Sequence, residues 1–215
     1  MTKKGIFITF EGPDGCGKTT IINLIYKDLQ KKFGKDNVVL TREPGGKNNV
    51  IAEDIRNILL NKLDYKISDR AEALLFAASR AQHVKDFIIP NLKKKKIVLC
   101  DRYIHSSLVY QGYARKLGIK EVWDINNFAI NNTMPDFTIL LMLKPEQGLA
   151  RIQANKNRDV NRLDRETLDL HKQVYLGYKK IANLYKNKIV QIDANNTIER
   201  VHKDTIKAIL KKINK

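Results

Sequence analysis

The stretch FEGPDGCGKTT, residues 10–20, decides how this chain folds. Gly12 is followed by four residues and then by Gly17, Lys18 and Thr19, which is the pattern of a phosphate-binding P-loop. An apolar run at residues 5–10 precedes the stretch and predicts a strand, and an apolar-periodic run to about residue 33 predicts a helix. A strand, a glycine loop and a helix in this order are the context that the motif requires.

Phosphate binding explains why these residue types occur at this spacing. The glycines allow backbone N–H groups to turn inward around phosphate oxygens, and the N-terminus of the following helix adds a favourable dipole. Lys18 is placed to reach the β- and γ-phosphates, and Thr19 to ligate Mg²⁺. The sequence therefore predicts a site for a nucleoside triphosphate, formed by Gly12, Pro13, Asp14, Gly15, Cys16, Gly17, Lys18, Thr19 and Thr20.

The rest of the chain alternates short apolar runs with helical patterns. Further strands are predicted at residues 38–41, 97–100, 137–143 and 189–192. Helices are predicted at residues 50–60 and 68–92, over much of 103–131, from about 145 to 185 with a charged interruption at 155–165, and at the C-terminus. This alternation predicts an α/β fold in which a five-stranded parallel sheet carries helices on both faces. A length of 215 residues fits a single domain, residues 1–215.

Composition limits where the protein works and what it binds. No apolar run has the length of a membrane span, the N-terminus lacks the pattern of a signal peptide, and two cysteines give no disulfide framework. We therefore expect a cytoplasmic protein with no membrane partner. The formal net charge of +17 suits an anionic partner, but no nucleic-acid motif accompanies it. Solvated surface lysines are the favoured interpretation, and no nucleic-acid partner is expected.

Other classes of P-loop protein fit the sequence poorly. A guanine-reading motif is matched only by NKLD at residues 61–64, which follows a helical pattern and comes too early in the chain. A motor would carry an apolar strand ending in Asp-Glu, whereas the third predicted strand runs into CDRYIHSS. A single acid followed by an arginine favours phosphoryl transfer to a small molecule.

An arginine-rich stretch, RIQANKNRDVNRLDRE at residues 151–166, breaks a helical pattern late in the chain. The transferred phosphoryl group is an anion between two other anionic groups, so its transfer depends on positioning and on neutralising charge. A polar break rich in arginine is more typical of a mobile lid than of a plain charged loop. We expect this lid to close over the phosphates.

Several motifs, in this order along the chain, resemble those of bacterial thymidylate kinases. They are the P-loop, TREPGG at residues 41–46, LLFAASRAQH at 74–83, DRYIHSSLVYQGY at 101–113 and RDVNRLDRE at 158–166. The resemblance implies the nucleoside monophosphate kinase architecture of P-loop NTPases, with a lid at about residues 151–166, and usually a homodimer. It also implies Mg²⁺-dependent transfer of the γ-phosphate of ATP to dTMP, which gives ADP and dTDP for dTTP biosynthesis.

The resemblance further implies roles for individual residues. The catalytic set is Lys18, Arg102, Arg158 and Arg162, Thr19 and Asp101 lie at the metal, and Arg151 joins the P-loop in binding ATP. The residues that bind dTMP are Asp14, Arg42, Phe76, Arg80, Arg102, Ser106, Ser107 and Tyr110. Phe76 stacks on thymine, Arg80 bonds to its O4, and Tyr110 disfavours a 2′-hydroxyl. The alternative from a different class is a basic P-loop ATPase that binds nucleic acid, suggested only by the net charge.

The predicted helix at residues 68–92 offers a test of the base-binding role. A helical wheel places Leu74, Ala78, Ala81 and Ile88 on a core stripe, with Phe76, Arg80 and His83 on the opposite side. That opposite side is either a second packed face or a ligand-binding wall. An aromatic plane beside a forked donor suits a flat pyrimidine with a carbonyl edge. We therefore expect Phe76 and Arg80 to form the thymine wall, with no role assigned to His83.

Overall fold

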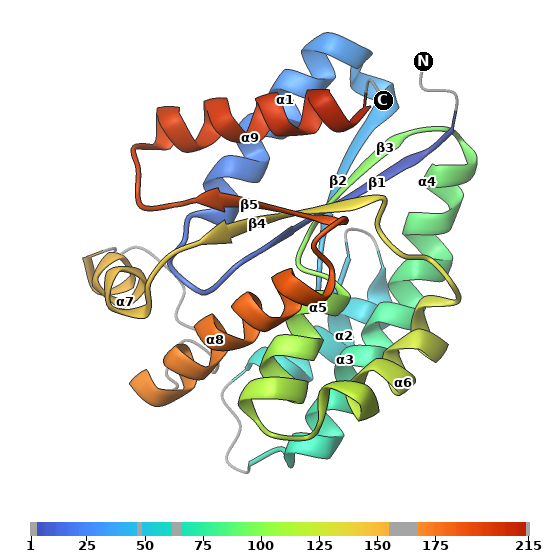
Figure 1. The fold of residues 1–215 in the computed structure, drawn as a ribbon. Helices are drawn as coiled ribbons and strands as arrows, with labels where there is room; N and C mark the ends of the chain where they lie inside the picture. The colour runs from blue at the N-terminus through green and yellow to red at the C-terminus, as the bar shows by residue number, and fades with distance from the viewer. Residues whose placement is uncertain (1–3, 47–48, 62–65, 155–166, 214–215) are drawn as a thin grey trace.

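The computed structural model describes residues 4–46, 49–61, 66–154 and 167–213. These residues form a five-stranded parallel sheet with helices on both faces (Figure 1), as the alternating pattern predicts. The strands follow the order β2-β3-β1-β4-β5 across the sheet. Their bounds are β1 Ile6–Glu11, β2 Val38–Arg42, β3 Ile97–Asp101, β4 Phe137–Met142 and β5 Ile189–Asp193.

Alternate residues of β1 belong to two separate apolar layers. Ile6, Ile8 and Phe10 pack in one core with α1 (Lys18–Phe33) and α9 (Ile198–Ile213), which lie side by side on one face of the sheet (Figure 1). Phe7 packs in the other core with the helices of the opposite face. Because both faces are covered, the central strands are mostly apolar, and the buried Thr9 and Thr138 hydrogen-bond to each other at 2.7 Å.

The opposite face carries most of the remaining helices. They are α2 (Val50–Leu60), α3 (Asp69–His83), α4 (Ile89–Lys93), α5 (Ile104–Ser107), α6 (Ile119–Ile130) and α8 (Leu168–Leu184). α7 (Pro145–Ala154) lies beyond the carboxyl end of β4 (Figure 1). Two π-helical segments, Val84–Ile88 and Leu108–Ala114, extend α3 and α5. The predicted helix at residues 68–92 is thus one helical run, capped by the hydroxyl of Ser68 and interrupted by a π-turn.

The predicted core stripe of this run is wrong. Leu74 is 56% exposed and Ala78 is also exposed, whereas Phe76, Arg80 and His83 are buried. The face that packs inward is therefore the one that carries the arginine and the histidine. Two physical facts explain why the periodicity predicted the wrong face. Polar side chains are buried here because they pair with one another, and the π-turn changes the helical phase before Ile88, which is buried.

Parallel strands bring the functional motifs to one edge of the sheet. Phe10 of β1 and Arg42 of β2 are both in register with Asp101 of β3, so the P-loop, the TREPGG loop and the segment after Asp101 begin side by side. Ligands of open α/β sheets bind outside the carboxyl ends of the strands. Among the helices that the described residues form, none has the length and apolar character needed to cross a membrane.

Candidate functional site

The P-loop occupies the turn between β1 and α1. Gly12 and Gly15 have φ of 145° and 77°, a region that L side chains rarely adopt. A Cβ on either glycine would also lie 2.3 Å from a backbone oxygen, that of Leu141 or that of Gly148. Both positions therefore require glycine, because the loop turns back tightly against β4 and α7.

Lys18 opens α1 and points back across the loop. Its ammonium donates to the backbone oxygens of Gly12 and Pro13 at 2.9 and 3.1 Å, so the charge is held over the turn. Cys16 is buried beside it, and burial raises the pKa of its thiol. A thiol that stays protonated is a poor nucleophile. Cys16 thus acts as a small packing residue in this loop.

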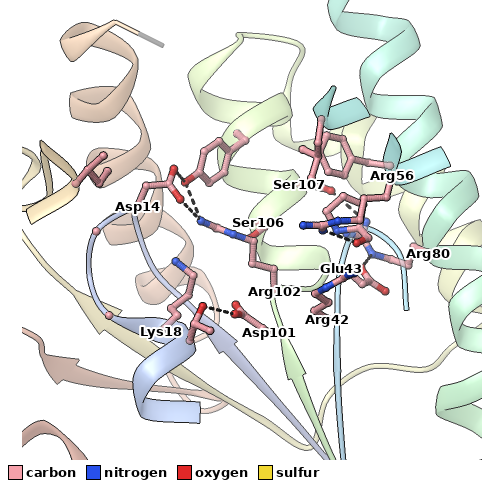
Figure 2. Close-up of a pocket in the computed structure, with 18 of the residues that line it drawn as sticks. Asp14, Lys18, Arg42, Glu43, Arg56, Arg80, Asp101, Arg102, Ser106 and Ser107 are labelled. Carbon is pink, nitrogen blue, oxygen red and sulfur yellow. Dashed lines mark hydrogen bonds and ion pairs between the residues drawn. The ribbon is translucent and has the colours of Figure 1, made fainter. Parts of the chain in front are cut away.

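Thr19 and Asp101 lie next to each other at the start of α1 and the end of β3. The hydroxyl of Thr19 donates to Asp101 Oδ2 at 3.3 Å (Figure 2). The second carboxylate oxygen, Oδ1, is buried and has no hydrogen-bond partner among the described residues. A hydroxyl and a carboxylate beside a phosphate-binding loop are hard oxygen ligands of the kind that Mg²⁺ prefers. The chemistry of the residues present therefore fits a magnesium ion.

A cavity of about 590 Å³ runs from the P-loop to α3 (Figure 2). It gathers most of the residues that the sequence predicts for the two nucleotides. Those that line it are Asp14, Gly15, Gly17, Lys18, Thr19, Thr20, Arg42, Phe76, Arg80, Asp101, Arg102, Ser106, Ser107, Tyr110 and Arg151. Gly12, Pro13 and Cys16 form the loop but do not line the cavity. Arg158 and Arg162 lie outside the described residues.

Arg102 stands at the middle of the cavity, in a backbone conformation with φ of 67°. This left-handed conformation is costly for a side chain other than glycine and is typical of functional sites. The guanidinium donates to Asp14 Oδ1 at 2.5 Å, and the hydroxyl of Tyr110 donates to Asp14 Oδ2 at 2.8 Å. Burial alone would raise the pKa of Asp14, but the cations of Arg102 and Lys18 and the Tyr110 hydroxyl outweigh it and lower the pKa to about 2. Asp14 is therefore an anion fixed between the P-loop and the acceptor side.

Arg80 is buried in the wall of the cavity and held by a polar network. Its Nε donates to Glu43 Oε2 at 2.6 Å, and its Nη1 donates to Ser107 Oγ at 3.1 Å and to the side-chain oxygen of Asn126. Glu43 Oε1 lies 3.0 Å from His83 Nδ1, and His83 Nε2 lies 2.8 Å from Thr41 Oγ1. His83, which the sequence left without a role, thus supports Glu43 from behind the cavity.

Phe76 lies one turn before Arg80 on the same face of α3. Its ring is 9% exposed and lines the cavity with Arg80 and Ser107. The cavity therefore has a flat apolar surface next to oriented hydrogen-bonding groups. Such a wall can bind a planar heterocycle and read a polar edge of it.

Two further arginines lie near the TREPGG loop. Arg42 pairs with Glu53 at 2.7 Å, and both side chains are partly exposed. Arg56 of α2 also lines the cavity and donates to the backbone oxygen of Pro44 at 2.7 Å. Burial and the neighbouring charge of Arg42 lower the pKa of Arg56. Sequence reasoning missed Arg56, because nothing in the amphipathic pattern of α2 separates it from an ordinary surface arginine.

Other residues around the cavity were also missed. Glu43 lies in the TREPGG motif, and Gln111 lies in the DRYIHSSLVYQGY motif. Their places beside residues predicted to bind dTMP are the signal that could have identified them. Gln111 lines the cavity, and its amide donates to the buried Glu72 at 3.0 Å. His105, which lies in the same motif as Ser106 and Ser107, packs on the sheet next to Thr138 and does not line the cavity. Burial lowers the pKa of His105 to about 4, so it is neutral at physiological pH.

Comparisons with known proteins agree with this geometry. Residues 10–205 match the family model described as thymidylate kinase. Thymidylate kinases of Clostridium novyi (strain NT) and Geobacillus sp. (strain WCH70) are each 50% identical to the chain over 210 residues, which are 97% and 98% of this chain and 99% and 98% of the relatives. A crystal structure of thymidylate kinase from Ehrlichia chaffeensis superposes with a TM-score of 0.75 at 32% identity, covering 96% of this chain and 99% of that one.

Proposed function

This chain belongs to the thymidylate kinase family, and we propose that it transfers the γ-phosphate of ATP to dTMP, giving ADP and dTDP for dTTP biosynthesis. One observation supports this function above the others. A single cavity joins the P-loop, with Lys18 and Thr19, to a wall formed by Phe76 and Arg80. A kinase for a nucleoside monophosphate needs both ends in one space, because donor and acceptor phosphates must meet in line.

On the donor side we assign the triphosphate to the P-loop, Lys18 and Arg151. Thr19 and Asp101 would hold Mg²⁺, which supplies charge neutralisation between the phosphates when it is bound. Residues 151–166 would act as the lid, with Arg158 and Arg162 as its catalytic cations. A lid that closes on bound nucleotides would bring these arginines to the phosphates and complete the catalytic arrangement.

On the acceptor side we assign thymine to Phe76 and Arg80. The ring of Phe76 would stack on the base, and the Arg80 guanidinium, fixed by Glu43, would donate to its O4. Asp14 would face the 3′-hydroxyl of the deoxyribose, and Tyr110, anchored to Asp14 at 2.8 Å, would leave no room for a 2′-hydroxyl. Ser106 and Ser107 line this part of the cavity.

The acceptor phosphate would bind between Arg102 and Arg42. A phosphate oxygen that attacks another phosphate is already negative, so the reaction needs little help from a base. Catalysis then depends mainly on arginines that neutralise the transferred phosphoryl group and the two anionic groups on either side of it. Arg102 is the residue best placed for both phosphates, because it lies between the P-loop and Ser106.

We also propose that the protein is a cytoplasmic homodimer. Leu74 of α3 and Phe128 of α6 are 56% and 90% exposed, and α3 packs directly against α6. Burying these two apolar side chains against a second copy of the chain would stabilise a dimer. Sedimentation of the purified protein at several concentrations tests this assignment.

An acceptor panel tests the proposed activity. The protein is incubated with ATP and Mg²⁺ and with dTMP, dUMP, dCMP or dGMP, with and without DNA. Phosphorylation of dTMP in preference to the others, unaffected by DNA and abolished by a chelator, is the expected result. ATP hydrolysis that is stimulated by DNA, without phosphorylation of any acceptor, would contradict the proposal and favour a nucleic-acid-dependent ATPase.

A further inference from the structure

Tyr178 of α8 is remote in sequence from the motifs that form the cavity, yet it contacts the central arginine. Its hydroxyl accepts from Arg102 Nη1 at 3.1 Å. The same hydroxyl donates to Glu11 Oε2 at 2.9 Å. Tyr178 has no exposed surface, and Glu11, the last residue of β1, is 1% exposed. A buried tyrosine therefore links the end of the central strand to Arg102.

Glu11 is surrounded by hydrogen-bond donors. Its Oε1 accepts from the backbone N–H groups of Tyr103 and Ser106 at 2.9 and 3.1 Å. Its Oε2 accepts from the hydroxyls of Ser106 and Tyr178 at 2.6 and 2.9 Å. Burial raises the pKa of Glu11, and the charge of Arg102 and these hydrogen bonds oppose that rise. All four contacts come from donors, which suits an ionised carboxylate, because it accepts hydrogen bonds at both oxygens and donates none. Glu11 thus fixes the direction in which both hydroxyls point.

The orientation of these two hydroxyls determines which of their atoms face the Arg102 guanidinium. Each hydroxyl carries one proton, and each proton is used toward Glu11. The oxygens of Ser106 and Tyr178 must therefore present lone pairs to Arg102 Nη1, at 3.0 and 3.1 Å. The negative charge of a fully buried carboxylate is in this way relayed to the guanidinium as two oriented acceptors. Hydrogen bonds to a charged group are stronger than neutral ones.

The other contacts of Arg102 come from two places. The P-loop supplies the backbone oxygen of Gly12 and the carboxylate of Asp14, and the helical run after β3 supplies Ser106 and Tyr110. Arg102 itself lies between β3 and this run, in the left-handed conformation. Tyr178 is the described contact from a third part of the fold, and its aromatic ring also packs edge-on against Tyr110.

We propose that Tyr178 is a positioning residue for phosphoryl transfer, whose hydroxyl, oriented by Glu11, fixes the Arg102 guanidinium between the P-loop and the acceptor phosphate. The proposal rests on the proposed function, because it assigns Arg102 to the phosphates. A misplaced guanidinium would bind dTMP nearly as well but would stabilise the transferred group poorly. The loss should therefore appear mainly in kcat.

The test is Tyr178→Phe, which removes one oxygen atom and keeps the ring. We expect kcat to fall about tenfold, the value for one hydrogen bond to a charged group, with the KM for ATP unchanged and the KM for dTMP changed by less than about threefold. Tyr103→Phe is the matched control. Its hydroxyl is also in a buried tyrosine, but it donates to the backbone oxygen of Thr133 at 2.9 Å, away from Arg102. This control should retain the wild-type kcat.

A double-mutant cycle with Glu11→Gln separates positioning from packing. If Tyr178 acts through Glu11 and Arg102, the double variant should lose no more kcat than Glu11→Gln alone, whereas independent effects multiply. A folded Tyr178→Phe protein with wild-type kcat, or one no slower than Tyr103→Phe, would overturn the proposal. Failure of the wild-type protein to phosphorylate dTMP would instead refute the proposed function. The two failures are therefore distinguishable.

Discussion

The two ends of the cavity are built in opposite ways. The P-loop is a contiguous segment in which backbone groups and Lys18 form the binding surface, and its glycines are required by positive φ and by close contact with β4 and α7. The acceptor wall is assembled from side chains of α3, the TREPGG loop, α5 and α6, joined by buried polar contacts such as Arg80 with Glu43. One end depends on local conformation, and the other depends on tertiary packing.

This difference implies that the two ends should fail differently when they are mutated. Replacing Lys18 should alter chemistry with little effect on packing, because its contacts lie within the loop. A change in the acceptor wall should weaken both dTMP binding and the fold, because a buried charge that loses its partner is costly.

The largest expected effect is that of Lys18→Ala. The substitution removes the cation assigned to the transferred phosphate, and we expect kcat to fall about 10²–10³-fold. Steady-state kinetics measure this loss, and thermal unfolding should change little, because the Lys18 ammonium bonds only to groups of its own loop among the described residues, the oxygens of Gly12 and Pro13 and the sulfur of Cys16. The exposed Lys120→Ala serves as the control and should be silent. A kcat within a few fold of the wild-type value would show that Lys18 is not a catalytic residue.

The next effect is that of Glu43→Gln on stability. Arg80 and Glu43 side chains are each 2% exposed, and removing one charge of a buried pair should lower the free energy of unfolding by about 3 kcal/mol. The matched control is Glu53→Gln, whose partner Arg42 is 47% exposed, and it should cost less than about 1 kcal/mol. Urea unfolding of both variants gives the comparison. Equal losses would show that burial does not distinguish the two pairs.

Asp14 belongs to the P-loop by sequence and to the acceptor side by its contacts. Its pKa in the folded protein, about 2, is below the ordinary value of 3.8, so its ionised form stabilises the fold above pH 4 and this contribution is lost as pH falls through 2. The shift is equivalent to about 2 kcal/mol. Compared with Asp14→Asn, the wild-type protein should gain most stability near pH 6 and progressively less below pH 4. A difference that is constant from pH 6 to pH 2.5 would contradict the ionised contact with Arg102.

The sequence was sufficient for the parts of the molecule whose signals are local. The P-loop requires glycine at set positions, and apolar strands alternate with amphipathic helices, so the sheet, the two helical faces and the P-loop between the first strand and the first helix could be predicted. Phe76, Arg80, Ser106 and Tyr110 were assigned through resemblance to a family. For Phe76 and Arg80, residue type and spacing alone left a packed face and a ligand wall both open and favoured the packed face.

What could not be predicted is which polar residues support the site. Glu11, Glu43, His83 and Tyr178 are buried and act through partners far away in the chain, and no periodicity marks a polar residue that is buried because it is paired. The same effect inverted the prediction for α3, where Leu74 is exposed and Arg80 is buried. The π-turn at Val84–Ile88 added a change of phase that a fixed helical period does not contain.

The most direct test of the assignment of Arg80 to thymine is a measurement of two KM values, for dTMP and for ATP, of the Arg80→Lys protein. This substitution keeps a cation against Glu43, so the fold should survive, but it removes the planar fork that would read thymine. We expect the KM for dTMP to rise about tenfold while the KM for ATP stays within about twofold of wild type. An equal rise in both KM values, or no rise in that for dTMP, would contradict the assignment of this wall to the acceptor base.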